Sequence, residues 1–391
     1  MTRRPALLLY CQHHLGLGHL VRTLALAEAL VERFEVVMLS GGALPAGVRA
    51  PRGVRMVPLP ALGLTVDGAL VSRDDRHSVE DAFALRRRTI LATWRSLRPA
   101  AVVLELFPFG RKKFGAELLP LLEAVQAAGP ARPLVVCSLR DILVERGDRA
   151  LLHDERACRI ANRHFDAVLV HADPRIARLE ETFRPATPLR VPVRYTGYVV
   201  PDDEPPAREH RAGIVVSAGS GVHGGPLVAA AVEAHRTLWP RRREPMRIVA
   251  GPSAPDAAWD ALRRAADETD GLEAVRWVPS LRDELARARA SVSLCGYNTA
   301  LDVLRSRVPA LVVPAALAGE GEQSLRARRL ERLGALRVLD EQRLDGPALA
   351  SALDDVLRFE PRPVDLRLDG AAETVRALER LLAERRQEAV A

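Results

Sequence analysis

Lysine and aromatic residues are scarce in this chain. Only Lys112 and Lys113 among its 57 cationic residues are lysines, and phenylalanine, tryptophan and tyrosine together make up 4% of the sequence. Surfaces that bind nucleic acids combine basic groups with aromatic rings on which bases stack. The arginine triplets at 86–88 and 241–243 contain no interleaved aromatic residue. We therefore interpret the basic residues behind the net charge of +7 as solvated surface residues that contribute at most weakly to binding of an anionic membrane or phosphate ligand. We expect no nucleic-acid partner.

Long apolar runs and paired cysteine motifs are also absent. No apolar run approaches the roughly 20 residues that span a bilayer. The apolar run near the N-terminus breaks at Gln12–His14 and has no small-residue cleavage site, so we interpret it as a buried strand. The cysteines are too widely spaced for a zinc site or a disulfide framework, and they fit a reducing cytoplasm: Cys11, Cys137, Cys158 and Cys295. We expect a cytoplasmic protein that at most touches the inner face of a membrane.

Short apolar runs alternate with helical patterns along the chain, which is typical of parallel sheets with crossover helices. In the first half the predicted strands are Ala6–Tyr10, Val36–Leu39, Val102–Leu106, Leu134–Cys137 and Ala167–Val170, with helices at about 20–31, 80–97, 117–128 and 150–163. In the second half the predicted strands are Ile214–Ser217, Met246–Ala250, Val275–Val278, Ser291–Leu294 and Ala310–Val313, with helices at Leu227–Leu238 and Leu281–Ala288. The pattern predicts an α/β fold of two Rossmann-like, doubly wound domains.

A chain of 391 residues is too long for one core, which makes two domains the expectation. The proline-rich, charged stretch 200–212 is the best linker. We predict an N-terminal domain over 1–198, a linker over 199–212 and a C-terminal domain over 213–391. The last helix, at about 368–388, is expected to pack back on the N-terminal domain. Two such domains would face each other across a cleft at the carboxyl ends of their sheets.

The loop after the first strand is the first that could carry chemistry. Its Gly16-x-Gly18 pair is half of a dinucleotide fingerprint, but Val21 replaces the third glycine and no carboxylate follows the second strand. We therefore do not expect NAD binding. His19 lies near a helix start, where the dipole disfavours the imidazolium and keeps the ring neutral, as a base requires. A histidine that merely fills the first helical turn explains the residue equally well.

Two further loops follow strands of the same predicted sheet. One runs from Glu105 to Arg111, and the other runs from Ser138 to Asp141. Arg140 and Asp141 form either an ion pair at a helix start or part of an acceptor pocket, because charged residues directly after a buried strand suit both roles. Both interpretations stay open.

The second half contains a ligand-type stretch at 293–326 and a glycine loop. The Gly219–Gly221 loop precedes a helix and can wrap a diphosphate with its backbone N–H groups. Thr299 followed by Asp302 indicates a helix capping box, or else places a carboxylate at a nucleotide ribose. Gln323 is either a surface residue of a first helical turn or an amide that binds sugar hydroxyls.

One combination of motifs runs through nearly the whole chain. It comprises Gly18-His19-Leu20-Val21-Arg22, Phe107–Phe114, Cys137–Leu143, Gly219-Ser220-Gly221, Gly296-Tyr297-Asn298-Thr299 with Asp302, Pro309 and Pro314, and Glu322-Gln323 with Arg326, Ala327, Gly334 and Ala335. This combination resembles the GT-B glycosyltransferases of family 28, and the second half is similar to the donor domain of MurG-like enzymes. Within that group the chain most resembles a bacterial set described as predicted glycosyltransferases.

The resemblance implies a hexosyltransferase whose second domain holds a nucleotide-diphosphate sugar, usually a UDP-sugar. His19 falls at the histidine of the family's Gly-His loop, a base or an acceptor-site group. Asp302 falls where the family places a glutamate at the ribose, and Gln323 falls where a glutamine contacts the sugar. The acceptor side is expected at Arg22, Glu105, Arg140 and Asp141. The donor side is expected at Gly18, Gly219, Ser220, Gly221, Gly296, Asn298, Thr299, Asp302, Glu322 and Gln323.

We expect direct displacement at the anomeric carbon, with a small-molecule or lipid-linked acceptor and no metal or other cofactor. No Asp-x-Asp motif ends a predicted strand, and Asp74-Asp75 and Asp202-Asp203 lie in polar or linker segments. Two alternatives remain. A non-hydrolysing UDP-sugar epimerase would need carboxylates around the sugar, for which Glu105 and Asp141 are the candidates. A catalytically silent nucleotide-sugar-binding protein would keep the donor pocket alone.

Overall fold

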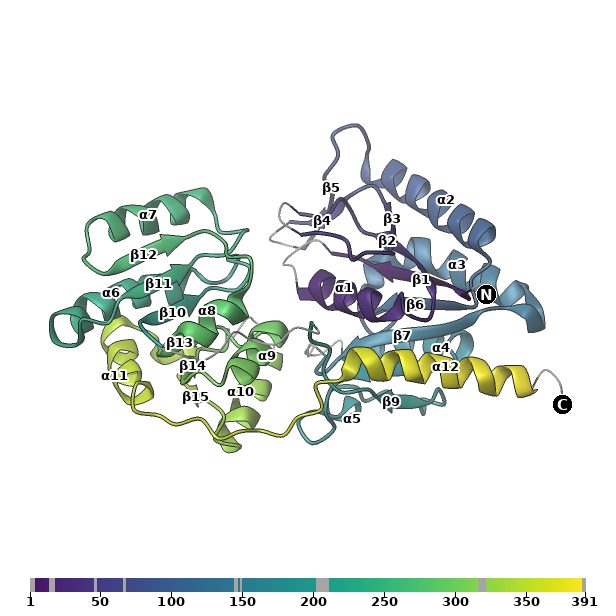
Figure 1. Ribbon diagram of the computed structural model, residues 1–391. Coiled ribbons are helices and arrows are strands. Elements are labelled where there is room, and N and C mark those ends of the chain that lie inside the picture. The colour runs from purple at the N-terminus through teal and green to yellow at the C-terminus, as the bar shows by residue number, and fades with distance from the viewer. Residues whose placement is uncertain are drawn as a thin grey trace. The chain divides into compact units, whose positions relative to one another are not determined.

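A computed structural model describes residues 4–13, 18–45, 48–65, 68–143, 147, 150–201, 211–315 and 321–388. The chain divides into two compact units, one formed by Met1–Pro201 with Leu366–Ala391 and the other by Asp202–Asp365 (Figure 1). The second unit ends before the predicted boundary at 391, because the chain returns to the first unit after Asp365. Most of the predicted linker 199–212 lies outside the described residues, as does Gly16.

The first unit is built on a parallel sheet with the strand order β3-β2-β1-β6-β7-β8-β9. Its strands are β1 (Ala6–Cys11), β2 (Glu35–Ser40), β3 (Arg55–Pro58), β6 (Ala101–Glu105), β7 (Leu134–Arg140), β8 (Ala167–His171) and β9 (Val193–Tyr195). Its helices are α1 (Gly18–Leu30), α2 (Val79–Leu97), α3 (Gly115–Ala127), α4 (Ala150–His164), α5 (Leu179–Thr182) and α12 (Gly370–Glu388). A separate antiparallel hairpin is formed by β4 (Leu62–Leu64) and β5 (Leu70–Ser72).

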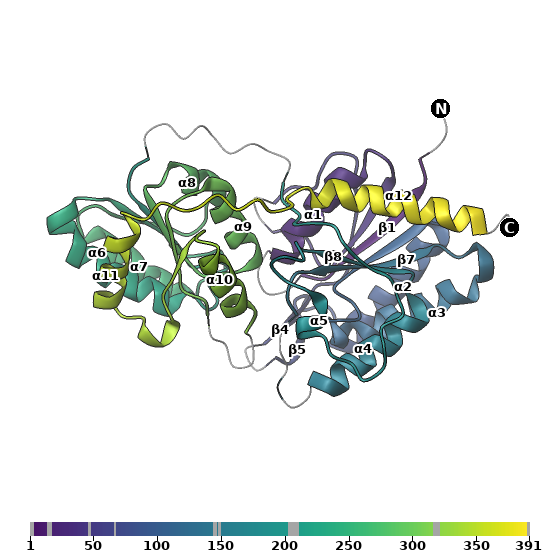
Figure 2. The ribbon, with the colours of Figure 1, turned by 90° about the horizontal axis from the view of Figure 1, so that it is seen from below.

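The central strand β1 is buried on both faces, since Leu7 to Cys11 have no exposed surface. A continuous apolar run of this kind is what a parallel strand between two helical layers requires. On one face Leu7 packs with Leu20 of α1 and Leu378 of α12. The last helix thus completes the core of the first unit and lies along α1, as both views show (Figure 1, Figure 2).

Two segments of the first unit pair in antiparallel fashion, one where the chain leaves this unit and one where it returns. Tyr198 N–H donates to the Arg367 carbonyl over 2.7 Å, and Gly370 N–H donates to the Tyr198 carbonyl over 3.0 Å. Gly197 has a φ of +88°, and a Cβ at this position would lie 2.8 Å from the Arg367 oxygen. The backbone angle and the close approach together require glycine here.

The second unit holds another parallel sheet, with the strand order β12-β11-β10-β13-β14-β15. Its strands are β10 (Ile214–Ser217), β11 (Met246–Val249), β12 (Leu272–Val275), β13 (Ala290–Ser293), β14 (Ala310–Val312) and β15 (Arg337–Val338). Its helices are α6 (Gly225–Arg242), α7 (Asp256–Asp267), α8 (Leu281–Arg287), α9 (Tyr297–Ser306), α10 (Glu322–Arg332) and α11 (Gly346–Val356). Leu227 of α6 and Leu349 of α11 pack together in its core with Val216 of β10.

The strand predicted at 275–278 is wrong. β12 pairs with β11 from Leu272, opposite Met246, to Val275, opposite Val249. Trp277 lies beyond the end of this strand and is 40% exposed. Helix α7 was not predicted, since Leu262 is the one fully buried residue among those the structure describes in it. Across the described ranges, no helix is both long and apolar enough to cross a membrane.

Candidate functional site

The sheet of the first unit has a topological switch point between β1 and β6. The chain runs from β1 to β2 and β3 on one side of the sheet, and β6 begins the strands of the other side. Open α/β sheets bind ligands at such a point, at the carboxyl ends of the strands. His19 and Arg22 lie on α1, which follows β1, and Glu105 is the last residue of β6. Three of the predicted site residues therefore meet there.

His19 and Arg22 share the carboxylate of Glu105. His19 Nδ1 lies 2.6 Å and a terminal nitrogen of Arg22 lies 2.5 Å from the same oxygen, Oε1. The two residues are three positions apart on α1 and therefore project from one face of the helix. The side chains of Arg22 and Glu105 are buried, whereas 19% of the His19 side chain is exposed. Within this trio the histidine is the residue that a ligand can reach.

The charges around this trio fix its protonation. Burial alone would raise the pKa of Glu105, but His19, Arg22 and Arg111 outweigh burial and lower it, so the carboxylate is ionised. Burial lowers the pKa of His19 to about 3, against the opposing effect of Glu105 and with a further lowering from Arg111. A neutral ring beside an ionised carboxylate carries its proton on Nδ1 and keeps a lone pair on Nε2. This is the arrangement of a general base oriented by a carboxylate.

Arg111 completes the surroundings of Glu105 and was missed as a site residue. Its Nε lies 3.7 Å from Glu105 Oε2, and 10% of its side chain is exposed. A tight turn brings it there, in which Gly110 N–H donates to the Leu106 carbonyl over 2.8 Å. Leu106 and Arg111 both have positive φ, at +65° and +55°, which is rare for side-chain-bearing residues and recurs at functional sites. The signal available in the sequence was a glycine and an arginine shortly after a carboxylate at a strand end.

The loop predicted after the next strand starts later than expected. β7 extends to Arg140, so Ser138 lies inside the strand, where its Oγ is 2.8 Å from Nε2 of the buried His171. Arg140 lies close enough to His19 to contribute to the lowering of the pKa of that ring. Asp141 is 1% exposed. Arg140 therefore belongs to the surroundings of the base, and Asp141 is a buried carboxylate beside it in sequence.

The cysteine at the end of β1 is buried. Burial raises the pKa of the Cys11 thiol, which lies at the end of β1, to about 12, so this thiol is a poor nucleophile. Among the residues that the structure describes, no group of three or more histidine, cysteine, aspartate or glutamate side chains could hold a metal ion.

The sheet of the second unit has its own switch point, between β10 and β13. The Gly219–Gly221 loop follows β10 and the Cys295–Gly296 turn follows β13. The two are neighbours, since a Cβ on Gly219 would lie 3.8 Å from the Leu294 side chain. Gly221 has a φ of +91°, and its Cβ would lie 2.6 Å from the Ala250 oxygen. Only glycine fits there, and the loop lies close against the end of β11.

The capping box predicted at Thr299 and Asp302 is wrong. Helix α9 begins at Tyr297 with Gly296 as its N-cap, and Thr299 lies inside the first turn. The Gly296 carbonyl accepts the first helical bond, from the Ala300 N–H over 2.9 Å. Asp302, in the second turn, is half-buried. Helix capping therefore no longer explains this carboxylate.

Helix α10 contacts the backbone that follows β13. Gln323 Oε1 lies 3.0 Å from the Cys295 N–H nitrogen, and Arg326 Nη1 lies 2.7 Å from the Cys295 oxygen. Glu322, in the same first turn, is 7% exposed. The predicted Glu322-Gln323 pair thus lies beside the predicted Gly296-to-Thr299 segment. Arg326 belongs to the motif but was not predicted as a site residue, since its position in the first turns of a helix also suits a surface arginine.

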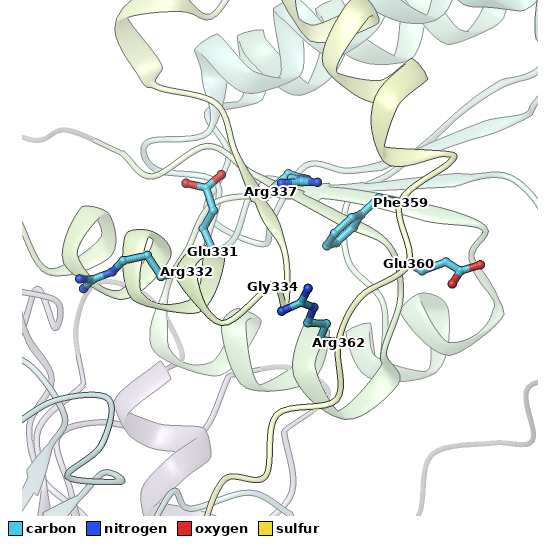
Figure 3. Close-up of a pocket in the computed structure, with 7 residues that line it drawn as sticks. All are labelled: Glu331, Arg332, Gly334, Arg337, Phe359, Glu360 and Arg362. Carbon is cyan, nitrogen blue, oxygen red and sulfur yellow. The ribbon is translucent and has the colours of Figure 1, made fainter.

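A separate cavity of about 400 Å³ opens in the second unit. Figure 3 shows its lining residues, which are Glu331, Arg332, Gly334, Arg337, Phe359, Glu360 and Arg362. The Arg337 guanidinium stacks on the Phe359 ring at 4.6 Å, and Arg362 N–H donates to the Gly334 carbonyl. No predicted donor residue lines it, so we assign it no part in the candidate site.

The second half of the chain matches one family of known proteins. Residues 214–378 match the glycosyltransferase family 28 C-terminal domain. A UDP-N-acetylglucosamine–N-acetylmuramyl-(pentapeptide) pyrophosphoryl-undecaprenol N-acetylglucosamine transferase from Leuconostoc citreum (strain KM20) is 25% identical over 154 residues, 39% of this chain and 41% of that protein. The chain thus matches less than half the length of this relative.

Solved structures match over nearly the whole chain. MurG of Acinetobacter baumannii has a TM-score of 0.55 at 15% identity and covers 98% of this chain and 100% of its own. A UDP-glucosyltransferase from Polygonum tinctorium, capable of glucosylating indoxyl, has a TM-score of 0.58 at 15% identity and covers 98% of this chain and 94% of its own. The predicted GT-B architecture of two Rossmann-like domains is therefore confirmed.

Proposed function

We propose that the protein transfers a hexose-type sugar from a UDP-sugar to an acceptor hydroxyl or amine, because residues 214–378 match the glycosyltransferase family 28 C-terminal domain and the chain has a GT-B fold. The observation that carries the proposal is the His19–Glu105 pair at the switch point of the first sheet. The acceptor is a small molecule or a lipid-linked group.

The proposed reaction is a direct displacement in which His19 is the base. The acceptor oxygen or nitrogen forms a bond to the anomeric carbon, and the bond from that carbon to the diphosphate oxygen breaks. The acceptor's proton passes to His19 Nε2, and the ionised Glu105 stabilises the imidazolium that results. Arg22 is buried and forms an ion pair with Glu105. We therefore propose that Arg22 orients the carboxylate and does not bind the acceptor. Arg140 and Asp141 stay on the acceptor side.

The second unit supplies the proposed donor contacts. Backbone N–H groups of the Gly219–Gly221 loop and of the α9 N-terminus would stabilise the leaving diphosphate without a metal. Asp302 would bind the ribose hydroxyls; it is a half-buried residue in the second turn of α9. Gln323 would contact the sugar. The other proposed donor-side residues are Gly296, Asn298, Thr299 and Glu322 of the second unit and Gly18 of the first unit.

Thermal-shift screening tests the donor half of the proposal. UDP, UDP-glucose and UDP-N-acetylglucosamine should raise the melting temperature, whereas NAD and ATP should not, because a ligand that binds only the folded state stabilises it. Addition of EDTA should leave these shifts unchanged. A chain that no uridine nucleotide stabilises would refute the proposal.

His19→Ala tests the catalytic half. It should keep the nucleotide-sugar affinity of the wild type and lose on the order of 10²- to 10⁴-fold in transfer rate. His164→Ala, which removes a buried histidine on α4, is the control and should retain transfer per folded molecule. An epimerase would instead release an epimerised nucleotide sugar without an acceptor. A silent binding protein would show nucleotide shifts and no turnover in the wild type.

A further inference from the structure

The second unit has a cavity that the proposed glycosyl transfer does not use. Its volume of about 400 Å³ is within the range of small-molecule sites. Its lining comes from the end of α10 and the turn after it, from the first residue of β15, and from the stretch 359–362 after α11. β15 is the edge strand of the parallel sheet, so its first residue lies at the amino ends of the strands. The Gly219–Gly221 loop follows the carboxyl end of β10, and the cavity therefore lies at the opposite end of the sheet from the proposed donor loops.

Arg337 and Arg362 bring two guanidinium groups to this cavity. Figure 3 shows both beside the Phe359 ring, whereas the side chains of Arg332 and Glu360 extend away to opposite sides. Arg337 and Arg362 are exposed, so a ligand from solution can reach them. The charges that such a ligand meets are therefore mainly those of these two arginines.

No carboxylate within the described ranges forms an ion pair with Arg337 or Arg362. By contrast Arg358, directly before the stretch 359–362, pairs with Asp355 over 3.1 Å. The Glu331 carboxylate also lines the cavity, but its Oε1 accepts a backbone N–H of β15 over 3.0 Å. Neighbouring guanidinium groups without a counter-charge repel each other, and an anion bound between them would replace this repulsion by attraction.

Local contacts hold both arginines in place. The Arg337 guanidinium stacks on Phe359, 4.6 Å from the ring centroid. The Arg362 N–H donates to the Gly334 carbonyl over 2.9 Å. The aliphatic stem of Arg362 lies against Gly334, where a Cβ would be 2.9 Å from Cδ, and the φ of +73° at Gly334 also favours glycine. Guanidinium groups fixed before a ligand arrives lose less conformational entropy when the ligand binds.

We propose that this cavity binds a phosphate monoester through Arg337 and Arg362. A guanidinium group binds phosphate oxygens through parallel N–H donors. Two such groups suit a tetrahedral dianion, whose oxygens point in several directions, better than a carboxylate, whose two oxygens lie in one plane. The phosphate is carried by a small soluble molecule or by a lipid headgroup. Its binding ties the stretch 359–362, which precedes the return of the chain to the first unit at Leu366, to the start of β15.

Calorimetric titration of the full chain with inorganic phosphate and with glycerol 3-phosphate tests the site. UDP is present throughout, because phosphate can also bind at the proposed diphosphate loops, and chloride keeps the ionic strength constant. Both probes should bind the wild type. Arg337→Met and Arg362→Met should each weaken this binding about tenfold, since each removes a charge-assisted interaction. Arg264→Met removes an exposed arginine of α7, on the side of the sheet that ends in β12, and is the control expected to match the wild type.

Lysine variants and vesicles refine the assignment. Arg337→Lys and Arg362→Lys keep the charge and lose the planar fork, so they should recover only part of the affinity. If the phosphate belongs to a lipid headgroup, the chain should sediment with phosphatidylcholine vesicles that contain phosphatidic acid and not with phosphatidylcholine alone, and Arg337→Met should abolish this. If it belongs to a soluble molecule, glycerol 3-phosphate should bind and neither kind of vesicle should.

Amide hydrogen exchange locates the bound probe. Glycerol 3-phosphate should slow the exchange of the 357–362 amides in the wild type and not in Arg337→Met. The site is refuted if neither phosphate probe nor vesicle binds, or if the methionine variants keep the wild-type affinity, which would put the anion elsewhere on the chain. An equal loss in Arg264→Met would also refute it, because the net charge alone would then account for binding. A lower melting temperature of Arg337→Met with unchanged affinity of the folded protein would leave the arginine a structural role only.

Discussion

Glu105→Gln should damage both stability and catalysis. The carboxylate is fully buried and contacts His19 at 2.6 Å, Arg22 at 2.5 Å and Arg111 at 3.7 Å. The neutral amide removes the negative charge that faces the guanidinium groups of Arg22 and Arg111. Removing one partner of a buried ion pair typically costs about 3–5 kcal/mol, so we expect the free energy of unfolding to fall by about that amount.

The same substitution changes which ring nitrogen of His19 carries the proton. A glutamine can turn its NH2 group toward His19 Nδ1, which then accepts, and the ring proton moves to Nε2, where the base needs a lone pair. The amide also fails to stabilise an imidazolium. We therefore expect the turnover of folded protein to fall on the order of 10²- to 10⁴-fold.

Glu117→Gln provides a matched control in the same unit. Glu117 is also fully buried and bonded to an arginine, with Arg86 Nε 2.6 Å from Oε2, and it accepts from the Tyr10 hydroxyl over 2.6 Å. Both variants would be compared by urea denaturation and by release of UDP from the nucleotide sugar, normalised to folded protein. Both should lose stability, and only Glu105→Gln should lose turnover. Equal turnover in the two variants would refute the assignment of Glu105 to the base.

Substitutions of His19, Gly197 and Gly221 give three further predictions. The pKa of His19 falls from about 6.5 to about 3 on folding, so between pH 3 and pH 6.5 the unfolded chain binds more protons than the folded chain. The free energy of unfolding of the wild type should therefore rise with pH across this range. His19→Gln should flatten that rise in urea titrations at successive pH values. Gly197→Ala places a Cβ 2.8 Å from the Arg367 oxygen at a φ of +88°, and should lower the free energy of unfolding by about 1–3 kcal/mol; an unchanged urea midpoint would contradict this. Gly221→Ala places a Cβ 2.6 Å from the Ala250 oxygen, so the loop must move. It should weaken UDP binding to the folded protein, as measured by calorimetry at a temperature below the unfolding transition of the variant.

The sequence predicts the fold well because buried parallel strands are continuous apolar runs. β10 was predicted with the bounds that the structure has, and β1 was predicted one residue short of its end at Cys11. Two failures lie in elements with few fully buried residues. β9 is half-buried along its length, and α7 fully buries Leu262 alone among its described residues.

The candidate site was predictable only in part. His19 and Glu105 could be proposed separately because each follows or ends a buried strand, but their 2.6 Å contact depends on strand order, which joins residues 86 positions apart. Arg111 reaches Glu105 through a turn with two positive φ angles, and no residue type in the sequence requires them. Gln323 was predicted as a sugar contact, whereas its bonds to Cys295 and Ala315 arise from tertiary packing that periodicity does not reveal.

The two switch points carry different chemical groups, and the difference matches what each half of a transfer reaction needs. A base requires an oriented lone pair, and the point between β1 and β6 holds a neutral His19 whose Nδ1 is fixed by Glu105. A diphosphate requires several N–H donors and close backbone approach, and the point between β10 and β13 holds Gly219–Gly221 and the start of α9. Substitutions in the first unit should therefore change the rate of the chemical step, and substitutions at the loops of the second unit should change donor affinity. A single-turnover rate measured at saturating donor separates these two effects, because saturation removes the contribution of donor binding.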